Sequence, residues 1–521
     1  MTEDRLHRDH LPGGIDAPVM PTAVGMVHLG IGAFHRAHQA VYTERAAIAT
    51  GDTTWGILGV TQRSATVRDQ LRPQGGVYSV LTAGEQESSV ELIGSVVDVA
   101  YPAEETGRVL AALAAPSTHV VTLTITEKGY ARRPDGSLDT EAVAGDLAAL
   151  AAVVAAGGGA AGGAPGGAPG GAPGGAPGGA EDAVRPAASA IGLLVRGLAA
   201  RAASGAPITV LTCDNMVDNG RVLERLVREA ADAALPGPEG DTLRAFLDAS
   251  VTFPCSMVDR IVPATTPEQR DQVERTLGVR DEGLVVGEPF AQWVIEDRFA
   301  GPRPAWEAAG ATLTKDVAPF EQAKLRLLNG THSLVAYSGW LAGHTTIAGA
   351  VTDPVIAERA RQYLFEDALP TLTAPEGLDL RQYGEQILSR FANPHTGHTT
   401  AQVAMDGTQK IPFRWGGVLA DSLAAGREPH GVAFGLAAWA EFVRRRTHSG
   451  EGIDDPRAAE LEALIGAAEV PGGSDGLGDV AGLAGAEEDL RVLLTLPGLL
   501  PAGTPESYVD TVAAELEAVL G

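Results

Sequence analysis

The chain has 521 residues, of which 45% are hydrophobic, so it is long enough for two domains with separate cores. Its 39 Lys and Arg residues against 66 Asp and Glu residues give a formal net charge of −27, which argues against nucleic acid and anionic membranes as partners because both would be repelled. There is no apolar run of about 18 residues, no signal-peptide pattern at the start, and only two cysteines, so we expect a cytoplasmic protein without a membrane span or a disulfide framework.

The first part of the chain predicts strands that alternate with helices. A short apolar strand is followed by Gly30-Ile-Gly32 and a helical stretch over 33–47. This order of strand, Gly-rich turn, helix and strand is typical of a doubly wound α/β nucleotide-binding domain of the Rossmann type. The runs that predict strands are 24–29, 55–60, 78–83, 90–99, 119–125 and 208–212.

Residues 155–180 form a low-complexity segment, AAGGGAAGGAPGGAPGGAPGGAPGGA. Gly and Ala offer almost no side chain to bury, and the repeated Pro residues block regular structure, so we expect a flexible surface insertion. Helical patterns over 140–154 and 183–203 flank it, which indicates an insertion within one domain.

From about residue 290 the pattern becomes helical. We therefore predict a nucleotide-binding domain over 1–289 and a mostly α-helical substrate domain over 290–521. The stretches with helical apolar spacing are 323–341, 354–364, 431–446 and 487–494.

The turn after the first strand is the candidate coenzyme site. Gly30, Gly32 and Phe34 belong to an incomplete dinucleotide fingerprint in which His35 takes the third glycine position. After the second strand, residues 60–66 contain Arg63 but no carboxylate, so this loop leaves the choice of coenzyme open. We expect NAD as the coenzyme, with NADP not excluded. Discrimination against NADPH should then be weak.

The chain has 35 Arg but only four Lys residues, so a retained Lys is a candidate for proton transfer, which a guanidinium does not perform. At roughly 100° per residue, Glu321, Lys324, Asn329 and His332 share one side of a helix if Gly330 does not break it. Burial would lower the pKa of such a Lys toward that of a general base, and Asn is a neutral donor to an alkoxide. The structural alternative is a capped helix end with Lys324 in solvent.

Two further polar sites follow apolar runs. Asn215 comes just after the strand at 208–212, where ligands bind in open α/β sheets. Asp259 and Arg260 end another apolar stretch, and a structural ion pair between them is the alternative to a functional role. The histidines lack metal-site spacing, so we expect no metal.

Together these residues resemble the polyol-specific long-chain dehydrogenases, the family of mannitol 2-dehydrogenase and fructuronate reductase. The resemblance covers about residue 25 to at least 410 and is most specific in FPCSMVDRIVP and KLRLLNGTHS. The matching stretches are VHLGIGAFHRAHQAVY (27–42), LTITEKGY (123–130), CDNMVDNG (213–220), FPCSMVDRIVP (253–263), EPFAQWVIED (288–297) and KLRLLNGTHS (324–333).

The resemblance implies a metal-independent, NAD(P)-dependent secondary-alcohol dehydrogenase and assigns a role to each matching residue. It makes Lys324 the general base and Glu321 an acid on the proton path. The oxyanion hole falls to Asn215 and Asn329, and the residues that line the substrate site are His332, Asp259, Lys410 and Gln402.

The resemblance leaves two substrate pairs. D-Mannitol and D-fructose are the first choice; D-mannonate and D-fructuronate are the alternative, because Gln402 stands where mannitol dehydrogenases tend to carry Arg. Yet Thr399 stands where the fructuronate branch usually has Arg. A non-catalytic nucleotide-binding regulator is the alternative of another class, and the Lys, Asn and His set argues against it. We expect a monomer or small homo-oligomer.

Overall fold

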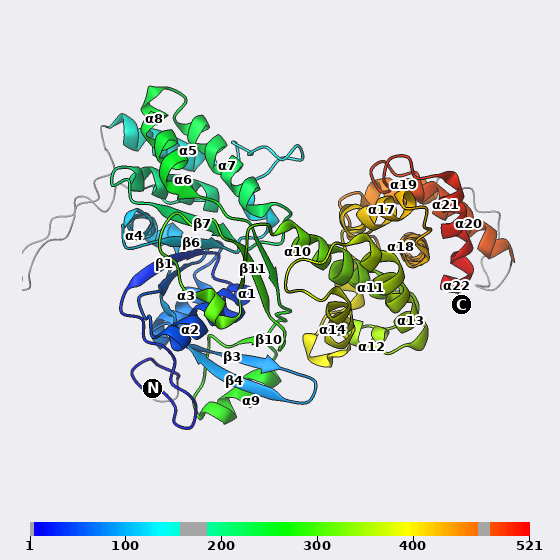
Figure 1. Cartoon of the computed structure of the whole chain (residues 1–521), viewed down its shortest axis with the longest axis horizontal. Coiled ribbons are helices and arrows are strands. Elements are labelled where there is room, and N and C mark those ends of the chain that lie inside the picture. Colours follow the sequence, from blue (N-terminus) through cyan, green and yellow to red (C-terminus); the bar gives the residue numbers. More distant parts are fainter. Residues whose placement is uncertain (1–4, 157–184, 467–479, 521) are drawn as a thin grey trace, which may run out of the picture. The chain divides into compact units, whose positions relative to one another are not determined.

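The computed structural model describes residues 5–156, 185–466 and 480–520 (Figure 1). The chain divides into two compact units, Met1–Val317 and Ala318–Gly521. Of the expected insertion at 155–180, residues 157–180 lie outside the described residues, while α5 (Ala144–Ala155) and α6 (Ala190–Ala202) flank it within the first unit.

The first unit is built on a six-stranded sheet in the order β5-β2-β1-β6-β7-β8. Every neighbouring pair is parallel, and the strand order is that of a doubly wound dinucleotide-binding sheet, which confirms the expected fold class. The strands are β1 (Val24–Leu29), β2 (Gly56–Val60), β5 (Val96–Ala100), β6 (Val120–Leu123), β7 (Ile208–Thr212) and β8 (Val251–Thr252).

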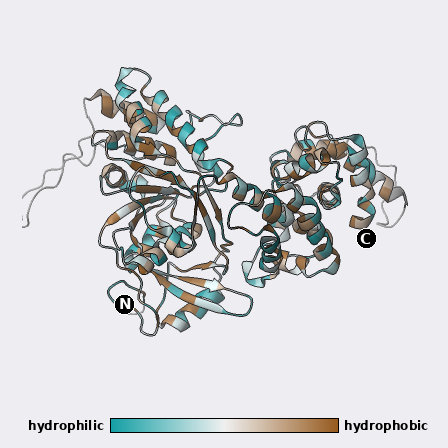
Figure 2. Ribbon diagram, viewed as in Figure 1, coloured by the Kyte–Doolittle hydropathy of each residue, from teal (hydrophilic) through white to brown (hydrophobic). Residues whose placement is uncertain are grey.

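Helices cover both faces of this sheet, as its almost wholly apolar strands require (Figures 1 and 2). Alternate residues of β1 face opposite cores: Val27 and Leu29 pack into one, and Met26 into the other. The first core includes residues of α4 (Pro102–Ala114), α5, α6, α7 (Asn219–Ala234) and α8 (Asp241–Ser250), and the second includes residues of α1 (Ala33–Ala37) and α2 (Gln39–Thr50).

Two three-stranded sheets complete the first unit, in the orders β10-β3-β4 and β12-β11-β9. The expected strand over 90–99 is in fact two strands, since β4 pairs with β3 in a hairpin and β5 joins the main sheet. Because β11 and β12 pair with each other, and β11 with β9, residues 290–317 belong to the first unit. The expected boundary at 289/290 therefore differs from the structural division.

The strands of the two smaller sheets are β3 (Tyr78–Ala83), β4 (Ser88–Ile93), β9 (Ser256–Asp259), β10 (Val285–Gly287), β11 (Gln292–Glu296) and β12 (Thr312–Thr314). The helices α3 (Thr66–Leu71) and α9 (Pro267–Leu277) also belong to the first unit.

The second unit is helical, as expected. Its longest helix, α18 (His430–Ser449), has a run of buried residues from Gly431 to Val443 and packs against α11 (Gly330–Leu341), α13 (Pro354–Gln362) and the last three helices. The others are α10 (Ala318–Ala323), α12 (Ile347–Val351), α14 (Leu380–Ala392), α15 (Thr400–Ala404), α16 (Gly407–Ile411), α17 (Gly417–Ala424), α19 (Ala458–Gly466), α20 (Val480–Leu494), α21 (Glu506–Ala514) and α22 (Leu516–Leu520).

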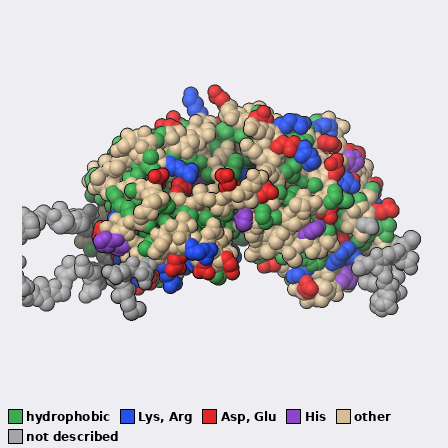
Figure 3. Space-filling view, turned by 90° about the horizontal axis from the view of Figure 1, so that it is seen from below, with side chains coloured by type: hydrophobic (Ala, Val, Ile, Leu, Met, Phe, Trp, Pro, Cys, Tyr) green, Lys and Arg blue, Asp and Glu red, His purple; other side chains and the backbone are tan. Residues whose placement is uncertain are grey.

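The surface carries both signs of charge. On the face shown in Figure 3, Lys and Arg side chains are interspersed with Asp and Glu rather than gathered into one basic patch. Within the ranges that the structure describes, none of the helices has the length and apolarity to span a bilayer, and no group of three or more His, Cys, Asp or Glu side chains is arranged to hold a metal ion.

Candidate functional site

The turn after β1 has the backbone geometry of a phosphate-binding turn. Gly30 has a φ of +94°, and a Cβ there would lie 2.2 Å from the main-chain oxygen of Thr124, so only glycine fits. At Gly32, which precedes the first residue of α1, a Cβ would meet nothing closer than the Gly30 oxygen at 3.8 Å. This open space at a helix start fits the approach of a coenzyme pyrophosphate.

The histidine at the third glycine position packs under this turn. The His35 ring stacks on His28 of β1 with centroids 3.4 Å apart and planes 17° apart. His28 is hydrogen-bonded through its two ring nitrogens to the hydroxyls of Thr122 and Thr124, at 2.7 and 2.9 Å. Burial lowers the pKa of His28 to about 3 and the pKa of His35 to well below its ordinary value, so both rings are neutral. A flat, neutral ring thus packs where glycine usually allows close helix–strand contact.

Two other residues were expected to bind the coenzyme: Phe34, which follows this turn in the chain, and Arg63, which follows β2. Phe34 is half-buried in α1 and stacks on the His38 ring, with centroids 5.1 Å apart. Arg63 is exposed in the segment between β2 and α3. The structure therefore leaves Arg63 in solvent rather than packed into the turn.

Asp214, just before Asn215, links the segment that follows β7 to the segment that follows β6 through hydrogen bonds. Its two carboxylate oxygens accept hydrogen bonds from the main-chain nitrogens of Ile125 and Thr126, each at 2.9 Å, and Oδ2 also accepts one from the Tyr130 hydroxyl at 2.7 Å. Asn215 follows on an exposed bend. The only signal in the sequence for this role of Asp214 is its position beside the candidate Asn215.

Asn219 links the end of β7 to the start of β9. Its side-chain amide donates to the main-chain oxygen of Ser256 at 2.8 Å and accepts from the main-chain nitrogen of Ser256 at 3.0 Å. The Ser256 hydroxyl donates to the main-chain oxygen of Thr212 at 2.7 Å. The two segments that carry Asn215 and Asp259 therefore start from one hydrogen-bonded junction, which sequence spacing did not reveal.

Asp259 is the last residue of β9 and is 5% exposed. The neighbouring Arg260 is buried and donates from its guanidinium to the main-chain oxygens of Glu288 and Ala37 and to the Thr82 hydroxyl. Arg260 therefore fastens β9 to the rest of the first unit through neutral acceptors.

In the second unit, the proposed base lies on a continuous helix with an irregular middle. α10 runs into a π-helical turn, Lys324–Asn329, which runs into α11. Gly330 does not break the helix, and Lys324 is buried, with 9% of its surface exposed. The expected spacing of 100° per residue does not hold across Lys324–Asn329, because a π turn fits an extra residue into each turn. The condition that Gly330 does not break the helix is met, and the shared side of Glu321, Lys324, Asn329 and His332 stays a prediction.

Side chains from distant segments bind the main-chain oxygens of this turn. The hydroxyl of Tyr363 donates to the oxygen of Arg326 at 2.6 Å, Arg414 to that of Asn329 at 3.2 Å, and the Trp415 indole to that of Gly330 at 3.1 Å. A Cβ at residue 330 would lie 2.0 Å from the Tyr363 hydroxyl oxygen, so glycine is required for this approach. The π turn is thus held by tertiary contacts, and π turns are frequent at functional sites.

His332 lies on α11 among aromatic and basic side chains. Its ring stacks on Phe391 and His398, with centroids 4.8 and 5.4 Å apart. Burial lowers the pKa of His332 to well below its ordinary value, and the nearby His398, Arg414, Lys410 and Arg390 lower it further. His332 is therefore a neutral hydrogen-bonding group near neutral pH.

The two remaining substrate-site candidates lie in and around α15 and α16. The ammonium of Lys410 donates to the main-chain oxygen of Val403 at 3.4 Å, and burial and Arg414 lower its pKa. Gln402 is exposed and forms a capping box with Thr399, whose hydroxyl accepts from the Gln402 main-chain nitrogen at 3.1 Å. Thr399 therefore has a local structural role as the N-cap of α15.

The chain matches two family models along most of its length. The model for the mannitol dehydrogenase Rossmann domain matches residues 24–308, and the model for the mannitol dehydrogenase C-terminal domain matches residues 316–471. Among curated proteins, D-mannonate oxidoreductase of Escherichia coli is 37% identical over 473 residues, which cover 89% of each chain. Mannitol dehydrogenase 2 of Saccharomyces cerevisiae is 34% identical over 463 residues, which cover 87% of this chain and 83% of that one.

Solved structures agree with these matches. The ternary complex of Pseudomonas fluorescens mannitol 2-dehydrogenase with NAD and D-mannitol is 29% identical, with a TM-score of 0.74 and coverage of 99% of this chain and 96% of that one. A substrate-free D-sorbitol dehydrogenase is 26% identical, with a TM-score of 0.76 and coverage of 98% and 96%. The chain belongs to the mannitol dehydrogenase family of oxidoreductases.

Proposed function

We propose that the chain catalyses reversible NAD(P)-dependent oxidation of a secondary alcohol, at C2 of a linear sugar alcohol or aldonate, without a metal. The observation that carries this proposal is the π turn at Lys324–Asn329, which places a buried Lys and an Asn at the two ends of one turn. Family membership and the NAD complex of the Pseudomonas fluorescens relative support the reaction class.

Lys324 is the proposed general base. In its neutral form it takes the proton of the substrate hydroxyl, and in the reverse direction its ammonium returns that proton. Glu321, one helical turn before it, is the proposed acid on the proton path. A guanidinium does not replace Lys324, because it does not lose its proton at ordinary pH.

The side-chain amides of Asn215 and Asn329 are the proposed donors to the alkoxide, since a neutral donor stabilises the developing charge without neutralising the base. His332 is the proposed neutral partner of the substrate oxygen, while Asp259, Lys410 and Gln402 are proposed to bind the remaining hydroxyls. The side-chain oxygen of Gln402 accepts a hydrogen bond from the main-chain nitrogen of Thr399 in the capping box, so its side-chain NH₂ group is the part proposed to bind a substrate hydroxyl.

The coenzyme site fits a dinucleotide. Gly30 and Gly32 would hold the pyrophosphate, and Phe34 and Arg63 lie on the segments that follow β1 and β2. The bound nicotinamide supplies the hydride acceptor. Glycine at position 32 leaves the space beside the turn open for the pyrophosphate, whereas a side chain at that position would fill it.

D-Mannitol and D-fructose are the first candidate pair, supported by the mannitol dehydrogenases among the relatives. A second pair, D-mannonate and D-fructuronate, is favoured by the basic groups around His332, namely Lys410, Arg414 and Arg390, which suit a substrate carboxylate. The similarity to D-mannonate oxidoreductase supports this pair as well.

The test is the oxidation of NADH and NADPH by the full chain with a panel of ketoses and keto-uronates. Turnover of D-fructose or D-fructuronate in a reaction that a chelator does not affect is expected. Absence of turnover across the panel, with coenzyme still bound, would favour the regulator over the enzyme.

A further inference from the structure

The carboxyl end of β2 lies beside the carboxyl end of β5, because the two strands pair in parallel with Val60 opposite Ala100. The main-chain nitrogen of Thr61 extends the pairing by donating to the oxygen of Ala100 at 2.9 Å. α4 begins at Pro102, immediately after β5. Its first turn is therefore beside the end of β2, where a doubly wound sheet binds the adenosine ribose.

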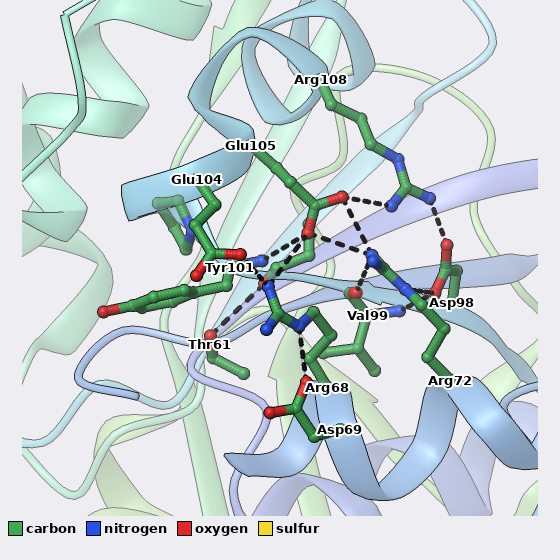
Figure 4. A network of polar contacts seen from close by, with 12 residues as sticks. Thr61, Arg68, Asp69, Arg72, Asp98, Val99, Tyr101, Glu104, Glu105 and Arg108 are labelled. Carbon is green, nitrogen blue, oxygen red and sulfur yellow. Dashed lines mark hydrogen bonds and ion pairs between the residues drawn. The ribbon is translucent and has the colours of Figure 1, made fainter. Parts of the chain in front are cut away.

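Glu104 in this first turn is paired with Arg68 of α3 (Figure 4). The Arg68 guanidinium donates to Glu104 Oε2 at 2.5 Å and to Asp69 Oδ1 at 2.8 Å, and it lies over the Tyr101 ring at 5.7 Å from the centroid. The side chain of Arg68 is 14% exposed, whereas that of Glu104 is 59% exposed. Arg68 is thus held in place, and Glu104 remains open to a ligand.

Taken as a whole, the cluster of ion pairs around Arg68 has more acidic than basic side chains. Arg72 and Arg108 are both paired with Asp98 and Glu105, at distances of 2.5–3.1 Å. Asp69, Asp98, Glu104 and Glu105 outnumber the three guanidinium groups by one. The positive charges of this cluster are therefore already compensated before any ligand binds.

We propose that Glu104 is the residue that makes this chain select NAD over NADP. The inference depends on the proposed dehydrogenase function. A carboxylate near the end of β2 accepts hydrogen bonds from the adenosine ribose hydroxyls of NAD. Residues 60–66 lack that carboxylate, and α4 supplies it from the next strand of the sheet.

The 2′-phosphate of NADP meets two obstacles at this edge. It is repelled by Glu104, and it has to displace Glu104 from Arg68 to gain a cation. Arg63, which the sequence pointed to as a phosphate ligand, is exposed and separate from this cluster of ion pairs. The weak discrimination expected from residues 60–66 therefore becomes a preference for NAD.

The test is to measure the dissociation constants of NADH and NADPH with the full chain. We expect wild type to bind NADH at least about tenfold more tightly than NADPH. Glu104→Gln should tighten NADPH by about tenfold and weaken NADH, with a smaller effect at high salt because the effect is electrostatic. The double variant with Arg68→Gln should lose the gain for NADPH, because the freed guanidinium is what binds the phosphate.

Asp248→Asn is the matched control. Asp248 is 66% exposed and pairs with Arg228 at 2.7 Å in the same unit, on α8, which contacts β8 at the opposite edge of the sheet from β5. It should leave both dissociation constants unchanged. An NADH to NADPH ratio that does not move in Glu104→Gln, with both coenzymes still bound, would overturn the role of Glu104 alone. Absence of binding of either coenzyme to wild type would overturn the proposed function together with this inference.

Discussion

The hydroxyl of Tyr363 lies 2.6 Å from the main-chain oxygen of Arg326, the third residue of the π turn that begins at Lys324. A side chain from another helical segment thereby binds a carbonyl of the turn that carries the proposed base. The position of Lys324 consequently depends on a contact that is remote in the sequence.

Tyr363→Phe tests this dependence. Loss of the hydrogen bond should cost about 1 kcal/mol of unfolding free energy and lower kcat through a displaced Lys324, while the NADH dissociation constant stays unchanged. Tyr508→Phe is the control, because Tyr508 is also buried and donates to a carbonyl, that of Pro429, at 2.9 Å. An equal fall in kcat in both variants would show that Tyr363 acts only through stability.

Lys324→Arg tests the proposed base with its positive charge retained. We expect turnover to fall by roughly 10²–10⁴-fold, because the guanidinium does not accept the substrate proton. Alcohol oxidation by wild type should rise with pH through one ionisation and then level off, and this rise should be missing in the variant. Lys315→Arg, at an exposed Lys, is the control that should behave as wild type. Near-normal turnover in Lys324→Arg would remove the base from the mechanism.

The raised pKa of Asp367 in the second unit leads us to expect that the free energy of unfolding depends on pH. It accepts a hydrogen bond from the main-chain nitrogen of Val432 at 2.9 Å, and burial raises its pKa from 3.8 to about 7. Between pH 3.8 and about pH 7, Asp367 is deprotonated in the unfolded chain but keeps its proton in the folded chain. The free energy of unfolding therefore falls as the pH rises through this range, and Asp367 causes no further fall above about pH 7.

Asp367→Asn should therefore flatten the pH dependence of urea unfolding between about pH 4 and pH 7. The asparagine carbonyl is still able to accept from Val432, so the fold should be retained. An unchanged slope in the variant would mean that Asp367 is ionised in the folded protein over this range.

The low-complexity segment is predicted to be dispensable. α5 and α6 are fastened directly to each other, because Asp146 accepts from Arg196 at 2.9 Å and from the Ser189 hydroxyl at 2.9 Å. Replacing residues 155–180 with a short Gly-Ser link should leave turnover and the melting temperature nearly unchanged, since closure entropy varies slowly with length. Asp146→Asn should lower the melting temperature in both forms. A large loss of turnover or of melting temperature when only the segment is replaced would show that the segment has a structural role.

The sequence by itself determined the features that depend on local chemistry. Apolar, β-branched runs such as Ile208–Thr212 favour buried strands, and Gly30 is required by a positive φ that other residues avoid. The fold class, the tight turn at Gly30 and the candidate residues of KLRLLNGTHS follow from such short stretches, which is why they could be named from the sequence.

The tertiary structure decided what depends on distant partners. Regular helical spacing does not hold across Lys324–Asn329, where Tyr363 and Arg414 bind the main-chain oxygens of a π turn. β11 and β12 join the first unit because they form a sheet with β9. Glu104 reaches the end of β2 only because β5 pairs with β2, a contact between segments about forty residues apart that no local pattern encodes.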